Sequence, residues 1–233
     1  MPRQTAPPWP PQGFGPMTFF IHTEADLDVG LHELVCADRR FEAVLATAGR
    51  PSLRRREGSF AGLASIVVSQ QLSTASASAI WARLTTAFNP LDPAAMRRAT
   101  PKRLRRIGLS TPKVRTLKAI AAAIIKGELD LNGLGAHVAD DAHKILTQVH
   151  GIGPWTADIY LLACLGHSDA WPAGDLALQE AVRLAFALEQ RPTARQMGPL
   201  AEPWRPWRAV AARLLWTYYR AVKGREGAPV KST

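Results

Sequence analysis

A glycine-rich turn in the second half of the chain could bind an anion. Gly151-Ile152-Gly153-Pro154 separates two segments in which apolar residues recur at helical spacing. The two glycines allow a sharp turn and a close approach to another molecule, and Pro154 stands where a helix can begin without its missing N–H. A loop that opens a helix presents unpaired N–H groups at the positive end of the helix dipole. In a chain this basic, the expected anion is a phosphate group of a nucleic acid.

An aspartate in a loop that contains proline and glycine is the second candidate for chemistry. Asp175 follows Gly153 by 22 residues, and one helix plus a short turn fills that distance, so its carboxylate should return to the vicinity of the hairpin. A carboxylate placed there could stabilise a developing positive charge and orient or deprotonate a water molecule. The simpler role of a helix N-cap fits the same position, and the two roles are compatible.

These residues resemble those of the helix-hairpin-helix DNA glycosylases, in which a Gly/Pro-rich loop with an essential aspartate follows the hairpin. The run from Gly151 to Ala157, Asp175 in its loop and the later segment Trp204–Arg208 are similar to the alkylbase branch, 3-methyladenine DNA glycosylase II. The resemblance covers roughly residues 30–222. It implies excision of alkylated purines (3-methyladenine, 7-methylguanine) in base excision repair, with Asp175 beside a sugar of oxocarbenium character. A glycosylase for deaminated bases such as uracil or hypoxanthine, and a non-catalytic helix-hairpin-helix DNA-binding module, are the alternatives.

One position distinguishes the members of this family that also cut the DNA strand. Those enzymes carry a lysine nucleophile at the second residue after the second hairpin glycine. This chain has Trp155 there, and no lysine follows nearby after Lys144. The resemblance therefore implies a monofunctional enzyme that uses water as the nucleophile.

No required cofactor is expected. The two cysteines, Cys36 and Cys164, cannot form the four-cysteine iron–sulfur loop of other branches, and we expect both to be buried free thiols. The six histidines are scattered, with His143 and His150 expected at the surface, so no side-chain metal site is predicted. The resemblance does imply a monovalent cation on hairpin backbone carbonyls, those of Thr147, Val149 and Ile152.

The resemblance also implies contacts to an extruded nucleotide and to the duplex around it. A side chain from a helix–helix loop should fill the gap left in the duplex, and the matching position is Gln71, with Leu72 next to it. Lys113 follows a Gly-Leu-Ser motif usual in the family and is expected either to touch a phosphate or to be exposed without a role. The expected base pocket consists of aromatic side chains: Trp155 and Trp216, for which a core role is the alternative, with Tyr160 and Trp171 as further candidates. The expected DNA-binding residues are Gly151, Ile152, Gly153, Thr156, Gln71, Leu72 and Lys113.

The composition is consistent with a polyanionic partner. The chain has 233 residues, 47% of them hydrophobic, a net charge of +10 and a pI near 10.3. We expect the partner to be double-stranded DNA with a damaged base, and the protein to be a monomer. The longest apolar run, residues 119–125, is too short to span a bilayer, and the N-terminus lacks a hydrophobic signal core. The expected location is the bacterial cytoplasm, in association with the nucleoid.

The elements that must position these residues are helices. Apolar residues recur at helical spacing and no useful alternating pattern occurs, which predicts an all-α fold of roughly ten helices in two lobes. The hairpin is expected at the mouth of a cleft between the lobes. The last long helix is expected from about Pro206 to Ala221. Helix N-caps are predicted at Thr23 or Asp26, Ser59, Ser73 or Thr74, Asp140 or Asp141, and Asp175.

The chain is expected to divide into three segments. Residues 1–22 are rich in proline and predict a poorly ordered lead-in, without the β-rich N-terminal domain that some bacterial alkylbase glycosylases have. Residues 23–225 are expected to form a single glycosylase domain of two helical lobes. Residues 226–233 read as a polar tail.

Overall fold

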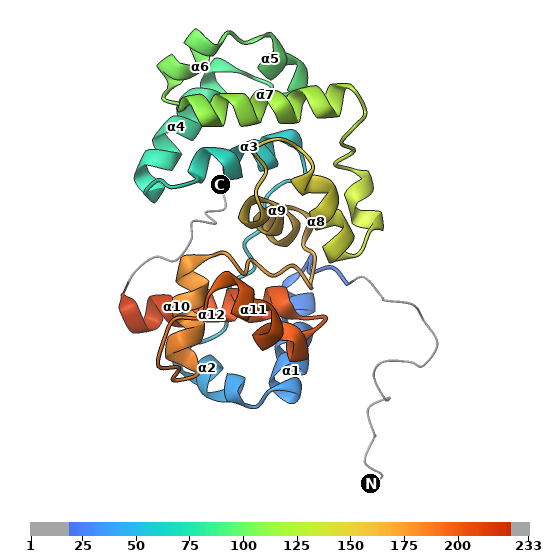
Figure 1. The fold of residues 1–233 in the computed structure, drawn as a ribbon. Helices are drawn as coiled ribbons and strands as arrows, with labels where there is room; N and C mark the ends of the chain where they lie inside the picture. Colours follow the sequence, from blue (N-terminus) through green and yellow to red (C-terminus); the bar gives the residue numbers. More distant parts are fainter. Residues whose placement is uncertain (1–18, 225–233) are drawn as a thin grey trace.

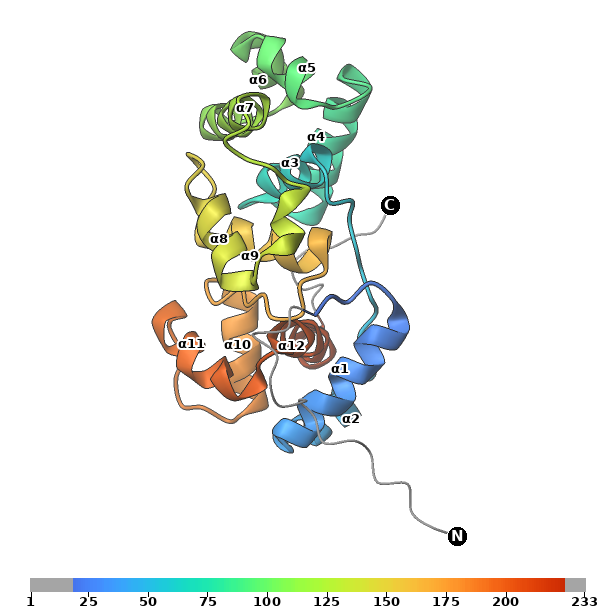
Figure 2. The same cartoon turned by 90° about the vertical axis from the view of Figure 1, so that its right-hand side faces the viewer.

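The computed structural model of the chain describes residues 19–224, and the regular structure in them is helical apart from one isolated β-bridge. Two groups of helices lie one above the other (Figures 1 and 2). The upper lobe contains α3 (Phe60–Ser69), α4 (Thr74–Ala87), α5 (Pro93–Arg98), α6 (Pro101–Ile107), α7 (Thr111–Ile125), α8 (Ala139–Thr147) and α9 (Pro154–Tyr160). The lower lobe contains α1 (Glu24–Ala37), α2 (Arg40–Ala48), α10 (Leu176–Ala185), α11 (Ala194–Ala201) and α12 (Arg208–Lys223). The prediction of an all-α fold is confirmed.

Four of the five helix starts that were predicted from a side-chain cap are confirmed. Thr23 accepts a hydrogen bond from the Asp26 backbone and completes a capping box with it at the start of α1. Ser59, Ser73 and Asp175 cap α3, α4 and α10 in the same way, each through a side-chain oxygen. These starts were predictable because a cap and the N–H group that it satisfies lie within three residues of each other.

Two helix starts and one whole helix were predicted wrongly. The N-cap of α8 is Val138, so neither Asp140 nor Asp141 caps it. The last helix begins at Arg208 and ends at Lys223, two residues later at each end than predicted. Helix α11 was missed, although Thr193 and Gln196 form a capping box at its start; Pro199 inside the segment had masked the helical pattern.

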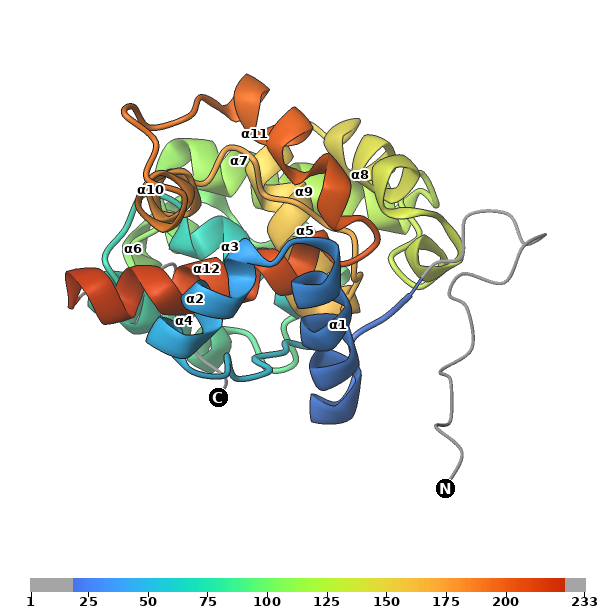
Figure 3. The same cartoon turned by 90° about the horizontal axis from the view of Figure 1, so that it is seen from below.

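The lower lobe is built around α12. Residues 208–216 of this helix are all buried, and α12 packs against α1, α2 and α10 (Figure 3). An aromatic cluster fills the space beside it, with the Trp204 ring 5.0 Å from Phe41, 5.5 Å from Trp171 and 5.7 Å from Phe186. Edge-to-face and tilted pairs of this kind add to the energy of apolar burial. This packing fixes the positions of the residues that α10 and α12 carry.

The chain entering α1 is part of the fold. Ile21 is fully buried and its N–H donates to the Gly166 carbonyl at 2.7 Å, while Phe20 forms the β-bridge with His167. Gly166 has a φ of +80°, and a Cβ there would lie 2.7 Å from the Ile21 oxygen, so only glycine fits. The predicted lead-in of residues 1–22 is thus wrong for residues 19–22; the rest of it and the tail of residues 226–233 lie outside the described residues.

Charged side chains join the lobes. Arg208 at the start of α12 donates from Nε to Asp169 at 2.7 Å, and its Nη2 reaches Asp140 of α8 at 3.3 Å. Arg205 binds the same two aspartates. Arg213, buried on α12, donates to the Leu162 carbonyl at 2.9 Å. Asp140 thus serves an ion network between lobes in place of the helix cap predicted for it.

Within residues 19–224, no helix combines the length and the apolar character needed to cross a membrane.

The two cysteines differ in environment. Cys164 is buried, as expected, but Cys36 is exposed on α1, because its position falls on the solvent-facing side of that helix.

Candidate active site

The hairpin between α8 and α9 has the predicted shape. Gly151 has a φ of +88°, and a Cβ there would lie 2.0 Å from the Thr116 hydroxyl of α7, so both backbone conformation and packing require glycine. Gly153 is the N-cap of α9, has extended backbone angles and faces open space. Its missing side chain therefore leaves room beside the first N–H groups of α9.

Three N–H groups from three elements converge on the carboxylate of Asp175. The Trp155 indole of α9 donates to Oδ2 at 2.8 Å, and the Trp216 indole of α12 donates to Oδ1 at 3.1 Å. The Leu178 backbone N–H of α10 donates to Oδ1 at 2.8 Å as the helix cap. Asp175 is 6% exposed. Hydrogen bonds to an ionised acceptor are the strong ones, so this arrangement stabilises a nearly buried carboxylate.

The two oxygens of Asp175 differ in their remaining capacity. A carboxylate oxygen can accept two hydrogen bonds, and Oδ1 already accepts from Leu178 and Trp216. Oδ2 accepts only from Trp155 among the described residues. Oδ2 therefore keeps a lone pair with which it can hold a water molecule or face a cation.

The aromatic residues predicted for a base pocket fall into two groups. Trp155 and Trp216 lie at Asp175, but as hydrogen-bond donors, a role that the sequence did not predict. Tyr160 is fully buried in the core, and Trp171 donates its indole N–H to the Met197 carbonyl at 3.0 Å. The structure thus gives Tyr160 and Trp171 packing roles, because both side chains are buried in the hydrophobic core.

The loop between α3 and α4 is linked to the hairpin. The Gln70 side chain donates to the Thr156 hydroxyl at 2.7 Å, which joins the end of α3 to the second residue after Pro154. Thr156 is 2% exposed, so its side chain serves this link and does not face outward as expected of a DNA-contacting residue.

Next to this link, Gln71 and Leu72 have different environments. Gln71 is exposed and has a φ of +54°, a left-handed conformation that is uncommon outside glycine. Leu72 is half-buried and packs against the core. Of the two, Gln71 is therefore the side chain that projects from the protein.

Lys113 has a role that the sequence did not predict. Its ammonium group donates to the carbonyls of Val68 and Gln70, both at 2.8 Å. A cation at the C-terminal end of a helix satisfies carbonyls that have no partner within the helix. Partial burial lowers the pKa of Lys113. Lys113 thus does not lie free at the surface: two of its three N–H donors hold the end of α3 in place ahead of Gln71.

A second carboxyl group lies on α9, facing α8. Asp158 is 9% exposed, and burial raises its pKa to about 8. Its Oδ1 is 3.6 Å from Nε2 of His143, whose own pKa is lowered by burial. His150 is exposed as predicted, whereas His143 is half-buried, because α9 covers it.

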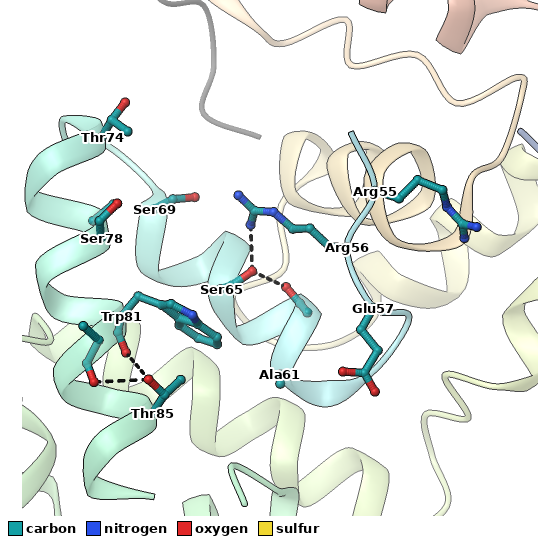
Figure 4. A pocket seen from close by; sticks show the side chains of 13 residues that line it. Arg55, Arg56, Glu57, Ala61, Ser65, Ser69, Thr74, Ser78, Trp81 and Thr85 are labelled. Atoms are coloured by element: carbon teal, nitrogen blue, oxygen red, sulfur yellow. Dashed lines mark hydrogen bonds between the residues drawn. The ribbon is translucent and has the colours of Figure 1, made fainter. Parts of the chain in front are cut away.

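A cavity of about 600 Å³ lies between α3, α4 and the segment of residues 55–57 (Figure 4). Hydroxyl groups line much of it, and Arg56 reaches across to Ser65 at 2.7 Å. Neither Asp175 nor the two tryptophans bound to it line this cavity. The candidate site is therefore the carboxylate with its donors, and not this cavity.

Among the described residues, no cluster of three or more His, Cys, Asp and Glu side chains could hold a metal ion. At the hairpin, the Val149 carbonyl already accepts the Ile152 N–H at 3.0 Å.

The functional contacts that sequence reasoning missed are the tryptophan N–H donors, the Gln70–Thr156 bond and the Lys113 contacts. They join residues far apart in the chain, so no local pattern signals them.

Comparison with known proteins gives a consistent result. Residues 64–206 match the model of the HhH-GPD superfamily base excision DNA repair proteins. The chain is 32% identical over 154 residues to DNA-3-methyladenine glycosylase 1 of Schizosaccharomyces pombe, an alignment that covers 64% of this chain and 68% of that relative. It is also 32% identical over 119 residues to the Bacillus subtilis DNA-3-methyladenine glycosylase, covering 51% of this chain but only 39% of that protein's length.

A solved structure agrees with these sequence matches. The S. pombe 3-methyladenine DNA glycosylase Mag1, determined in complex with abasic DNA, superposes with a TM-score of 0.72 at 27% identity. The superposition covers 86% of this chain and all of the yeast chain.

Proposed function

Because the chain belongs to the HhH-GPD superfamily of base excision DNA repair proteins, we propose that it is a monofunctional DNA glycosylase that excises alkylated purines. The observation that carries the proposal is the Asp175 carboxylate, held by three N–H donors beside the hairpin. The names of the relatives, 3-methyladenine glycosylases, support the choice of substrate.

The proposed reaction begins with binding to a duplex and extrusion of the damaged nucleotide. The N–H groups at the start of α9 lie beside the side-chain-free Gly153 and can bind a phosphate of the strand. Gln71 is exposed at the end of α3 and would fill the gap left in the duplex. The Gln70–Thr156 hydrogen bond fixes the position of the neighbouring Gln71 relative to the hairpin.

Bond cleavage would then follow at the sugar. As the base leaves, the sugar develops positive charge, which an adjacent carboxylate stabilises. The free lone pair of Asp175 Oδ2 faces the sugar or orients the attacking water. A positively charged base such as 3-methyladenine or 7-methylguanine leaves without protonation, so the site needs no general acid. The indole rings would also favour a cationic base over a neutral one, by about 0.5–2 kcal/mol.

We also propose that the hairpin carbonyls hold a monovalent cation. The carbonyls of Thr147, Val149 and Ile152 are neutral oxygen donors within one tight turn, which suits a singly charged ion better than a divalent one. Since Val149 already accepts one hydrogen bond, it would offer its second lone pair. The ion would offset the charge of the bound phosphate. No iron–sulfur cluster is proposed.

The test of the proposed function is release of bases from methylated DNA by the protein and by Asp175→Asn. We expect release of 3-methyladenine and 7-methylguanine, and a loss of at least about a hundredfold in rate in the variant, with lesion-DNA binding retained. Near-normal turnover by the variant would remove Asp175 from the mechanism. Release of uracil or hypoxanthine without either methylpurine would instead assign the protein to deaminated bases.

The choice of nucleophile is tested on the product strand. Because Trp155 stands where strand-cutting relatives carry lysine, we expect intact strands until alkali is added, and no covalent complex after borohydride treatment. A trapped protein–DNA adduct would contradict the use of water.

A further inference from the structure

The positive charge of the chain is confined to one part of the sequence. Residues 58–127 contain eleven Lys and Arg residues and one acidic residue, Asp92, a formal charge of +10. This equals the charge of the whole chain, so the remaining residues are neutral in sum. The segment comprises α3 to α7, and its α5–α6 end is the part of the upper lobe farthest from the lower lobe (Figures 1 and 2).

Four of the basic side chains in this segment stabilise the fold. Lys113 and Lys118 donate to carbonyls at the ends of α3 and α5. Arg83 of α4 donates to the Ile107 carbonyl at 2.7 Å, and Arg103 lies over the Phe88 ring. A fifth, Lys126, pairs with Glu128. These five have structural partners and are set aside.

The other six basic side chains form what we call the α5–α7 basic surface. All six are exposed, and in residues 19–224 no acidic side chain forms a salt bridge with any of them. Elsewhere, exposed basic residues such as Arg40, Arg50 and Lys144 each have an acidic neighbour. The six are Arg97 and Arg98 of α5, Lys102, Arg105 and Arg106 of α6, and Arg115 of α7.

The composition of this surface indicates the kind of partner. Lys102, Arg105 and Arg106 are three and four residues apart on one helix, so their charges repel each other unless an anion lies between them. Protein-binding surfaces usually have an apolar core, but the only exposed large hydrophobic residue described on α5–α7 is Ile125, at the far end of α7. Six exposed basic side chains on helices that pack against one another, with Ile125 as the one exposed large apolar residue described there, suit the phosphates of a nucleic acid.

The position of the surface relative to Gln71 sets where such phosphates would lie. Helix α4 begins just after Gln71, and its Arg83 contacts the end of α6. From the start of α4 to Arg83 is a helical distance of about 15 Å. On a duplex that runs along α4, at about 3.4 Å per base pair, this length places the surface roughly four base pairs from the residue that would fill the duplex gap.

We propose that the α5–α7 basic surface binds the phosphate backbone of duplex DNA flanking the damaged site, beyond the segment engaged by the hairpin and Gln71. This inference takes DNA as the partner from the proposed function, but it does not depend on excision. The surface adds sequence-independent affinity and keeps the protein on undamaged duplex between lesions.

The test compares Lys102→Gln/Arg105→Gln/Arg106→Gln with a control of equal charge loss, Arg39→Gln/Arg191→Gln/Arg195→Gln, made on exposed residues of the lower lobe. Binding to duplexes with a central abasic site, which fixes the position of Gln71, is measured against salt, with arms of about three or about twelve base pairs on either side of the site. On the long duplex, we expect the α6 variant to lower the log–log salt slope by about 2–3 and the control variant to leave it unchanged. On the short duplex the α6 variant should behave like the wild type.

The outcomes separate this inference from the proposed function. If the α6 variant keeps the wild-type slope and affinity on the long duplex, the surface does not bind DNA, and an acidic protein becomes the better partner. An equal loss on both duplexes, or in both variants, also overturns the inference. Absence of DNA binding by the wild type would instead overturn the proposed function. A second variant, Arg97→Gln/Arg98→Gln, guards against a local defect in α6 and should reproduce the loss.

Discussion

At the scale of single residues, the carboxylate of Asp175 owes its geometry to its donors. Trp155 and Trp216 approach it from two different helices, and the backbone of Leu178 fixes it from a third. Capping and catalysis are therefore compatible at one aspartate. The cap uses one oxygen, and the other oxygen remains available for the reaction.

This geometry predicts the effect of removing one donor while the ring is kept. Trp216→Phe deletes the N–H that donates to Oδ1, and a hydrogen bond to a charged acceptor contributes about 1.5–3 kcal/mol. We expect single-turnover excision to fall about tenfold or more, with affinity for undamaged duplex nearly unchanged. Trp171→Phe is the matched control, because its N–H binds the Met197 carbonyl in the core. A wild-type rate in Trp216→Phe would show that the donor is dispensable.

Asp158 leads to a prediction about stability and pH. Burial raises its pKa from 3.8 to about 8, with Asp140 acting in the same direction and Arg208 against it. The folded protein therefore keeps a proton that the unfolded chain releases, and folding is increasingly penalised as pH rises from about 4 to 8. Asp158→Asn carries no such penalty. We expect it to gain at least about 1 kcal/mol relative to wild type between pH 5 and pH 8.5 in urea unfolding. A difference that does not change with pH would contradict the assignment.

At the scale of elements, the loop after α3 is held on two sides. Lys113 of α7 binds the last carbonyls of α3, and Gln70 binds Thr156 at the start of α9. Gln71 lies between these contacts in its left-handed conformation. The residue that would fill the duplex is therefore positioned by the same helix that carries Trp155.

Breaking that connection should affect extrusion of the nucleotide. Thr156→Val keeps the shape of the side chain but removes the acceptor of the Gln70 hydrogen bond, whereas Thr156→Ser retains an acceptor. We expect Thr156→Val to lower excision by up to about tenfold, in line with about 0.5–1.5 kcal/mol for one such bond. The fluorescence of 2-aminopurine beside the lesion should fall, and we expect Gln71→Ala to show the same decrease. If Thr156→Ser is as defective as Thr156→Val, the hydrogen bond is not the cause.

At the scale of the whole molecule, the lobes are joined by charges as well as by chain crossings. Arg208 at the start of α12 and Arg205, three residues before it, bind Asp140 of α8 and Asp169 of the connecting loop. This network holds the elements that carry Trp155 and Trp216 in a fixed relation. The Asp175 site, which needs both, depends on it.

Removing one partner of this network should destabilise the protein. Arg208 is nearly buried, and Arg208→Met leaves the largely buried Asp169 carboxylate with Arg205 as its remaining partner, so we expect a cost of up to about 3 kcal/mol. Arg205→Met removes a more exposed partner and should cost about 1 kcal/mol or less. Urea unfolding of both variants measures the difference. Equal and small losses would show that the network does not stabilise the junction of the lobes.

The sequence by itself determined the features that depend on near neighbours. Helix starts at Thr23, Ser59 and Ser73 follow from caps within three residues. The hairpin follows from Gly151 and Gly153, which allow a sharp turn, and from Pro154, which can begin a helix. The Asp175 position was predictable for the same reason, since a loop, a cap and a helix of ordinary length place it near the hairpin.

Only the tertiary structure decided what each side chain touches across elements. Trp216 is 41 residues from Asp175, and Gln70 is 86 residues from Thr156. Contacts at such separations depend on how helices pack, and a tryptophan at helical spacing is equally suited to a core, a pocket wall or a hydrogen bond. The same holds for Lys113, which a local pattern places on a helix but only packing places against the end of α3. Local hydrogen bonding and apolar periodicity are encoded within a few residues, whereas the direction of a side chain is set by the elements packed around it.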